Sequence, residues 1–295
     1  MREFCERQIR RRGLAPSTIA GYRYWISDFL RRKLPAGRPL SGLPSTALES
    51  YIRVRGAQLA RTTLITAITC IQGFLLDCYE HGRLPERLDQ IDLPRRFRGE
   101  LPPRAMSWTL IDQLLRSIDL GGRTGRRDHA LLHLMAHYGL RTGEVTHLTL
   151  DSIDWRSRTL TVWQPKTLST LVLPLHDQTL RVLGDYLELT RPQTGLPWLF
   201  LRGGAPLGPM TKFSASYVFL VRARRSGLPP SQYSAYSLRH GFAHRLFQRG
   251  VGMKAIGDLM GHRNIVSTSI YLRLQADSLR EVALPVPRHE LGGAA

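Results

Sequence analysis

Cysteine is scarce in this chain of 295 residues, which contains only Cys5, Cys70 and Cys78. Three is an odd number, and the spacing of these residues matches no metal-binding pattern. A scaffold held together by disulfides is therefore excluded. We expect reduced thiols, with Cys70 and Cys78 packed on one helix.

Acidic residues are also few. The chain has 23 Asp and Glu against 42 Lys and Arg, which gives a formal net charge of +19. An excess of positive charge this large predicts a polyanionic partner, and nucleic acid fits it better than a membrane surface.

Long apolar runs are missing as well. No stretch approaches the roughly 20 apolar residues of a membrane span. The N-terminus, MREFCERQIRRRG, has no apolar centre of the kind that a secretory signal requires. The sequence therefore predicts a soluble, intracellular protein without a membrane partner.

The chain is long enough for about two domains, each with its own core. Residues 1–93 are predicted to be all helical. Apolar residues recur every three or four positions over 19–29, Thr46 and Glu49 have the spacing of a capping box, and a longer amphipathic helix is expected over 62–79.

Clusters of basic residues accompany these helices. For any one cluster, a solvated charged face is the ordinary explanation. For the whole set we favour contacts with DNA phosphates, because few acidic residues offset the charge. The set consists of Arg10, Arg11, Arg12, Arg31, Arg32, Lys33, Arg53, Arg55 and Arg61.

A basic, proline-containing linker is predicted at 94–107. Its first ten residues, PRRFRGELPP, have no helical or strand period. Arg95, Arg96 and Arg98 are placed to follow the backbone of a nucleic acid that both domains hold.

Helices are expected at 108–118 and 127–138 after the linker. The second of these places His129, His133 and His137 four positions apart on one face. A metal site is one interpretation, but the glutamate of an HExxH zinc motif is absent, so we expect no metal here. Gly139 then ends the helix.

Arg141 opens the next helix, with Glu144 three positions on and therefore on the same face. The pair is either a surface ion pair of little energetic value or a carboxylate that orients Arg141 toward a phosphate.

Two short strands are predicted at 159–163 and 170–175, with 164–169 as their turn. Lys166 lies in this turn. Such a lysine is ordinarily only an exposed charge, but a flexible side chain at a turn can also enter a minor groove and give a proton to a leaving oxygen.

Further helices are expected at 177–189 and 212–225. The second ends in Arg222, Arg224 and Arg225, which either contact phosphates or form a solubilising helix end. The region 234–274 reads SAYSLRHGFAHRLFQRGVGMKAIGDLMGHRNIVSTSIYLRL and suggests three short helices carrying Arg239, His262 and Tyr271.

These segments resemble the tyrosine recombinases, the phage-integrase superfamily. The run Leu238-Arg239-His240, then Gly261-His262, then Tyr271 is similar to the C-terminal signature of that family. The stretch YGLRTGEVTHLTLDSID resembles its first arginine box, and RTLTVWQPKTLSTLVLPL resembles its lysine-bearing hairpin. The resemblance covers residues 108–274, with its elements in the expected order.

The resemblance implies a mainly α fold with a small antiparallel β-sheet. A helical core-binding domain (1–93) clamps the DNA, a tyrosine-recombinase catalytic domain spans 108–275, and a tail spans 276–295. The implied catalytic residues are Arg141, Lys166, Arg239, His262 and Tyr271, with Glu144 as an acidic partner and no metal or other cofactor.

The chemistry implied by the resemblance is cleavage and rejoining of duplex DNA. Tyr271 attacks a phosphate and forms a 3′-phosphotyrosyl link, while Arg141 and Arg239 hold the phosphate oxygens. Lys166 protonates the departing 5′-oxygen, and His262 donates a hydrogen bond. Integration, excision, transposition by a mobile element and dimer resolution all fit this reaction.

One position departs from the family pattern. The family commonly has histidine three residues before the second arginine, where this chain has Tyr236. A phenol donates a hydrogen bond but does not share a proton near pH 7 as imidazole does. His240 lies about 100° around the helix from Arg239, so we expect it to be structural.

Two alternatives remain open: a DNA-binding protein of architectural type on the same scaffold, and a type IB topoisomerase. The expected partners are double-stranded DNA, three further copies of the chain in a tetramer on paired sites, and accessory DNA-binding proteins. The expected location is the cytoplasm, at the nucleoid. The tail docks either on its own domain or on a neighbouring protomer.

Overall fold

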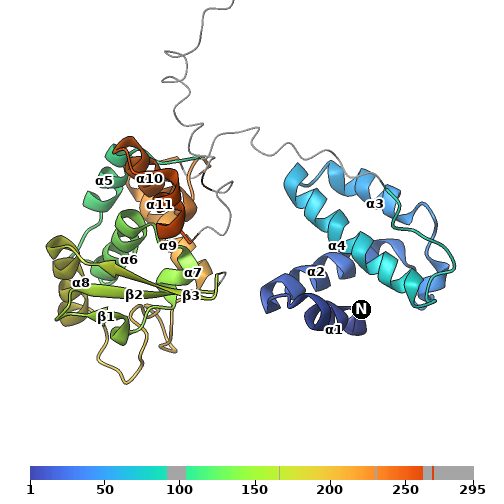
Figure 1. The fold of residues 1–295 in the computed structure, drawn as a ribbon, viewed down its shortest axis with the longest axis horizontal. Coiled ribbons are helices and arrows are strands. Elements are labelled where there is room, and N and C mark those ends of the chain that lie inside the picture. The colour runs from blue at the N-terminus through green and yellow to red at the C-terminus, as the bar shows by residue number, and fades with distance from the viewer. Residues whose placement is uncertain (92–103, 166, 230, 262–267, 269–295) are drawn as a thin grey trace, which may run out of the picture. The chain divides into compact units, whose positions relative to one another are not determined.

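The computed structural model describes residues 1–91, 104–165, 167–229, 231–261 and 268. The chain divides into two compact units, Met1–Arg98 and Gly99–Ala295 (Figure 1). The fold is mainly helical with one small antiparallel sheet, as the sequence predicts.

The first unit is all helical. Its elements are α1 (Arg2–Arg12), α2 (Pro16–Lys33), the 3₁₀ turn η1 (Leu40–Gly42), α3 (Ala47–Gly56) and α4 (Arg61–Glu80). The pattern of apolar residues predicts α2 and α4 but does not reveal α1. Thr46 is the N-cap of α3, but its side chain makes no capping hydrogen bond, so the predicted capping box is wrong.

Helix α4 is the central helix of this unit and packs against α2 and α3. By length and composition it is apolar enough to cross a membrane, and the sequence expectation of no such stretch was therefore wrong. Its apolar residues belong to the core of this unit, since Ile68, Ile71 and Leu75 are completely buried. Cys70 and Cys78 are buried free thiols, and burial raises the pKa of Cys70 to about 11.

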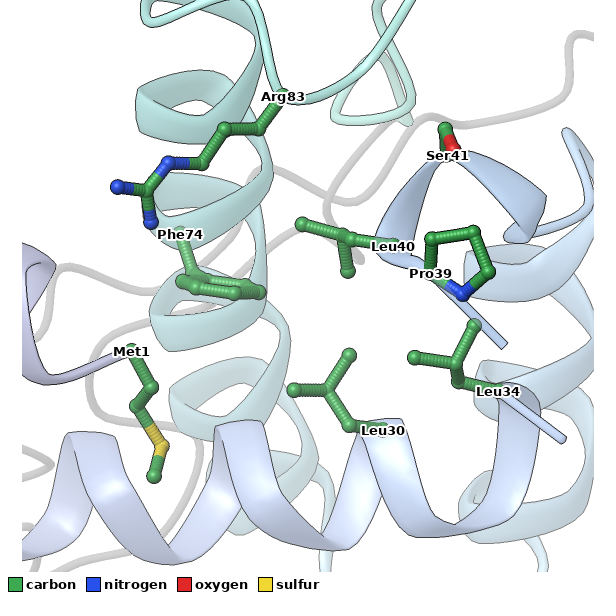
Figure 2. A pocket seen from close by; sticks show the side chains of 8 residues that line it. All are labelled: Met1, Leu30, Leu34, Pro39, Leu40, Ser41, Phe74 and Arg83. Atoms are coloured by element: carbon green, nitrogen blue, oxygen red, sulfur yellow. The ribbon is translucent and has the colours of Figure 1, made fainter. Parts of the chain in front are cut away.

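A hollow of about 460 Å³ opens on this unit (Figure 2). Leu30 on α2, Leu40 in η1 and Phe74 on α4 line it, together with Arg83. The guanidinium of Arg83 is paired with Glu3. Most of the lining is therefore apolar, and the Arg83 side chain is already paired with a carboxylate, so the hollow is a poor candidate for a phosphate site.

The second unit begins before its first helix. Met106, predicted to lie in the linker, is only 1% exposed, and its backbone N–H donates to the Ser237 carbonyl at 3.4 Å. The Arg104 guanidinium donates to the Ser231 carbonyl. The part of the linker that the structure describes, 104–107, therefore packs on the second unit.

The second unit combines helices with the sheet. Its elements are α5 (Trp108–Arg116), α6 (Gly125–Tyr138), α7 (Thr142–Thr146), the 3₁₀ turn η2 (Leu150–Ser152), β1 (Ile153–Asp154), β2 (Thr159–Gln164), β3 (Ser169–Pro174), α8 (Asp177–Leu189), α9 (Lys212–Arg225), α10 (Ala235–Gln248) and α11 (Met253–Leu259). The sheet has the order β1-β2-β3, with Leu160 opposite Leu173.

Helix α6 is the centre of this unit and packs against α5, α7, α8, α9 and α10. Its buried residues point in several directions around the helix axis, as expected for a helix surrounded by others. They include Leu131, Leu132, Leu134 and Met135. Gly139 follows at φ 63°, a left-handed conformation that turns the chain toward α7. This turn brings Arg141 to the Met260–Gly261 backbone that follows α11.

Candidate active site

Two arginines from distant parts of the chain meet on one carboxylate. Arg141 caps α7, and Glu144 is in the first turn of that helix. Arg239 lies in the first half of α10. Helices α6 and α10 pack together, so the segment that leaves α6 at Gly139 passes beside Arg239.

The Glu144 side chain is only 2% exposed. One oxygen is paired with the Arg141 guanidinium, and the other accepts the Arg141 backbone N–H at 2.8 Å. This second oxygen also lies 3.7 Å from Nη1 of Arg239. The carboxylate is therefore buried, so this is not a surface ion pair, and a single carboxylate faces both guanidinium groups.

Backbone carbonyl groups complete the arrangement. The Arg239 guanidinium donates to the carbonyl of Gly139 at 2.5 Å and to that of Met260. Nη2 of Arg141 donates to the same Met260 carbonyl at 3.0 Å and to Gly261 at 3.4 Å. The turn after α11 thus holds both arginines, immediately before position 262 in the chain.

The two arginines differ in exposure. The Arg239 side chain is 2% exposed, whereas that of Arg141 is 18% exposed. An approaching anion therefore meets Arg141 first.

Tyr236 and His240 lie one helical turn apart on α10, with their rings edge to face at 4.5 Å. Tyr236 is 47% exposed and His240 is 9% exposed. Burial, with a smaller contribution from the neighbouring Arg239 charge, lowers the pKa of His240 to about 4. His240 is therefore neutral at pH 7, as a structural residue would be.

Residues 109–278, more than half of the chain, match the phage integrase family model. The chain belongs to the phage integrase family. It is therefore an enzyme of the tyrosine recombinase type, a DNA strand transferase. The matched range includes Lys166, His262 and Tyr271, which lie outside the residues that the structure describes.

Relatives of this integrase-family chain span nearly its whole length. XerD of Xanthomonas campestris pv. campestris, a tyrosine recombinase, is 30% identical over 92% of this chain and 86% of its own. The protein y4rA of Sinorhizobium fredii, named as a candidate integrase/recombinase, is 29% identical over 96% of this chain and 69% of its own.

Solved structures share the fold. XerH recombinase bound to palindromic difH in a post-cleavage complex has a TM-score of 0.74 at 17% identity, covering 94% of this chain and 81% of that one. The Tn1549 transposon integrase with a circular intermediate DNA has a TM-score of 0.71 at 18% identity, covering 94% and 98%.

Most of the basic residues that the sequence assigns to DNA contact are on the surface of this integrase. Arg10, Arg11, Arg12, Arg31, Arg32, Arg53, Arg61, Arg224 and Arg225 are exposed, and Lys33 is partly buried. Arg95, Arg96 and Arg98 lie outside the described residues. The contact of these residues with DNA remains a prediction.

Two assignments need correction. Arg222 is 7% exposed, and its guanidinium donates to the buried Asp128 carboxylate at 2.6 and 2.9 Å. The Arg55 side chain is 12% exposed, lies 3.4 Å from Asp28 and donates to Gln58. Both guanidinium groups are committed within the protein, so they are structural residues. Sequence spacing did not reveal this, because Asp128 and Arg222 are 94 positions apart.

The three histidines of α6 lie in a row, and two of them, His133 and His137, are stacked. The rings of His133 and His137 are parallel at 4.0 Å, and Nε2 of His133 is 2.9 Å from Oγ1 of Thr179. No group of three or more His, Cys, Asp or Glu among the described residues is arranged to hold a metal ion. Burial, reinforced by the two neighbouring histidines, lowers the pKa of His133 to about 3.

Acid is expected to destabilise the second unit through His133. The folded form holds the imidazole neutral down to about pH 3, while the unfolded chain takes up a proton below about pH 6.5. Stability therefore falls as the pH falls through this window. Between pH 7 and pH 5, His133 alone should cost about 2 kcal/mol of unfolding free energy.

Urea denaturation at the two pH values measures this effect. His133→Gln, which does not titrate, should remove about 2 kcal/mol of the pH dependence. His147→Gln is the control, because His147 is an exposed histidine of the same unit. An unchanged acid dependence in His133→Gln would contradict the assignment.

Proposed function

We propose that this protein is a site-specific recombinase that cuts and rejoins duplex DNA through a 3′-phosphotyrosyl intermediate. The observation that carries the proposal is the meeting of Arg141 and Arg239 on Glu144 and on the Met260 carbonyl. In a chain of the phage integrase family, these are the two arginines that hold a phosphate.

The arginines supply the charge that the reaction needs. In this proposal the Tyr271 oxygen attacks the scissile phosphorus, and the bond from phosphorus to the 5′-oxygen breaks. Negative charge that develops on the phosphate is stabilised by guanidinium groups placed beforehand. A phosphate oxygen carries charge and a peptide carbonyl does not, so phosphate competes well with Met260 for the Nη groups.

Lys166 and His262 complete the proposed mechanism. The lysine protonates the departing 5′-oxygen, and the histidine donates a hydrogen bond to the phosphate. The phosphotyrosyl bond conserves the energy of the phosphodiester, so a new 5′-hydroxyl reverses the step without ATP. Glu144 orients Arg141 and balances the charge of Arg239.

We assign the first unit to gripping the DNA duplex and the second to the chemistry, with the enzyme acting at the nucleoid in the cytoplasm as a tetramer on paired sites. Support comes from the exposed arginines of both units and from the titles of similar structures, in which XerH and the Tn1549 integrase are bound to DNA. The net charge of +19 suits such a partner.

Trapping the intermediate tests the proposal. The protein is incubated with nicked duplexes carrying candidate sites from the DNA that flanks its gene, so that the cleaved fragment diffuses away and the adduct accumulates. A denaturing gel should show a covalent adduct, and peptide mass mapping should locate it at Tyr271. Binding without an adduct on every such site supports an architectural protein, and relaxation of plasmids that lack a specific site supports a topoisomerase.

A further inference from the structure

Gln164 is a polar residue buried next to the candidate active site. It is the last residue of β2, pairs with Ser169 of β3, and is only 3% exposed. The sequence analysis places it in the hairpin turn, at 164–169. A carboxamide has a carbonyl oxygen and an NH2 group. Burying them without hydrogen-bond partners is costly, so the neighbours of a buried glutamine matter to the stability of the fold.

On one side Gln164 braces the hairpin turn that contains Lys166. The Thr167 hydroxyl donates to Oε1 of Gln164 at 3.2 Å. The backbone carbonyl of Gln164 accepts the N–H groups of Thr167 at 3.2 Å and Leu168 at 2.9 Å. Both the side chain and the backbone of this one residue therefore fix the turn.

On the other side Gln164 lies against Gly261. Gly261 has φ +56°, and a Cβ added to it would lie 2.2 Å from Oε1 and 2.8 Å from Nε2 of Gln164. Only a glycine allows this approach. The carbonyl groups of Met260 and Gly261 accept hydrogen bonds from Arg141, so the backbone that the amide touches is the same backbone that holds the arginine.

We propose that Gln164 is a positioning residue that ties the Lys166 turn to the Met260–Gly261 backbone. It thereby fixes the described residues of the turn, on either side of position 166, relative to Arg141 and Arg239. This inference rests on the proposed function, because it matters only if Lys166 delivers a proton. A Gln164 that only filled space would pack equally well as an apolar residue of the same length.

Two variants separate these roles. Gln164→Met keeps the length of the side chain against Gly261 but removes both polar ends. Thr167→Val removes the hydroxyl that donates to Gln164 and keeps the shape of the threonine. Thr161→Val is the matched control, because Thr161 lies on the same strand with its side chain exposed.

The assay compares two nicked duplexes that differ by one atom. One has an ordinary phosphodiester at the scissile position, and the other has sulfur in place of the bridging 5′-oxygen. A thiolate leaves without being protonated, because the pKa of a thiol is about 8.5, far below that of an alcohol. Cleavage of the sulfur substrate therefore does not require the lysine proton.

Gln164→Met and Thr167→Val should cleave the ordinary substrate about 10 to 100 times more slowly than the unmodified protein, since general acids contribute roughly this much or more. Both should cleave the sulfur substrate within about threefold of the unmodified protein. Each protein preparation is tested on both substrates, so a smaller folded fraction lowers both rates equally and cannot produce this difference.

Two results would overturn the inference. One is cleavage of the ordinary substrate by Gln164→Met at the rate of Thr161→Val. The other is an equal loss on both substrates, which would mean that Gln164 does not act through proton delivery. If the unmodified protein forms no adduct with either substrate, it is the proposed function that fails, and that outcome is seen before any variant is compared.

Discussion

Tyr271→Phe is expected to bind DNA normally and to form no covalent adduct. Phenylalanine has the same ring but no hydroxyl oxygen, so the proposed attack on the scissile phosphorus cannot take place. Loss of a nucleophile typically reduces turnover by several orders of magnitude, and we expect adduct formation to fall at least about 1000-fold. Denaturing gels measure the adduct, and mobility shifts on native gels measure binding.

Tyr236→Phe is the matched control for that experiment. Tyr236 is a tyrosine on α10, three residues before Arg239 and half exposed, and its ring contacts His240 through an edge-to-face packing that phenylalanine preserves. We expect adduct formation within about threefold of the unmodified protein, because a phenol shares no proton near pH 7. A loss comparable to that of Tyr271→Phe would show that the Tyr236 hydroxyl is catalytic.

Glu144→Gln is expected to be the most destabilising of these changes. The carboxylate is 2% exposed and is the acidic group that faces both Arg141 and Arg239. The amide keeps the shape but leaves two guanidinium groups close together without a counter-charge. Removing one partner of a buried ion pair costs about 3–5 kcal/mol, and we expect a loss of this size in the free energy of unfolding.

Chemical denaturation followed by tryptophan fluorescence measures this loss, because four of the five tryptophans lie beyond residue 107 and report on the second unit. Glu188→Gln makes the same chemical change at an exposed site and should alter stability by less than about 0.5 kcal/mol. DNA should stabilise Glu144→Gln more than the unmodified protein, because a phosphate supplies the missing negative charge. Equal stability of the two Glu variants would rule out Glu144 as the counter-charge.

Local patterns predicted most elements of the fold. The apolar spacing at 177–189 and 212–225 predicts α8 and α9 with the bounds that the structure has. The predicted hairpin corresponds to β2 and β3, with three of the four strand ends moved by one residue. These predictions succeed because helices and hairpins depend mainly on neighbouring residues. Strand β1 was missed, since two residues are too few to show a period.

Contacts between distant residues were the part that sequence could not supply. Arg222 and Arg224 are two positions apart and chemically alike, yet Arg222 is buried against Asp128 while Arg224 is exposed. Gln164, Gly139 and the Met260 carbonyl were likewise not recognised as parts of the site. Two glycines of the motifs, Gly139 and Gly261, could have pointed to this part of the site. At both of them the backbone is left-handed and another side chain lies close to it.

The sequence by itself determined the positive charge, and through its resemblance to the tyrosine recombinases it indicated the class of the protein and its mainly helical fold. The same resemblance named five candidate catalytic residues, whose roles stay predictions. The tertiary structure decided that Arg141 and Arg239 share Glu144, and that Gln164 reaches Gly261. These pairings depend on how α6, α10 and the hairpin pack, which is set by the whole core rather than by any local stretch of the chain.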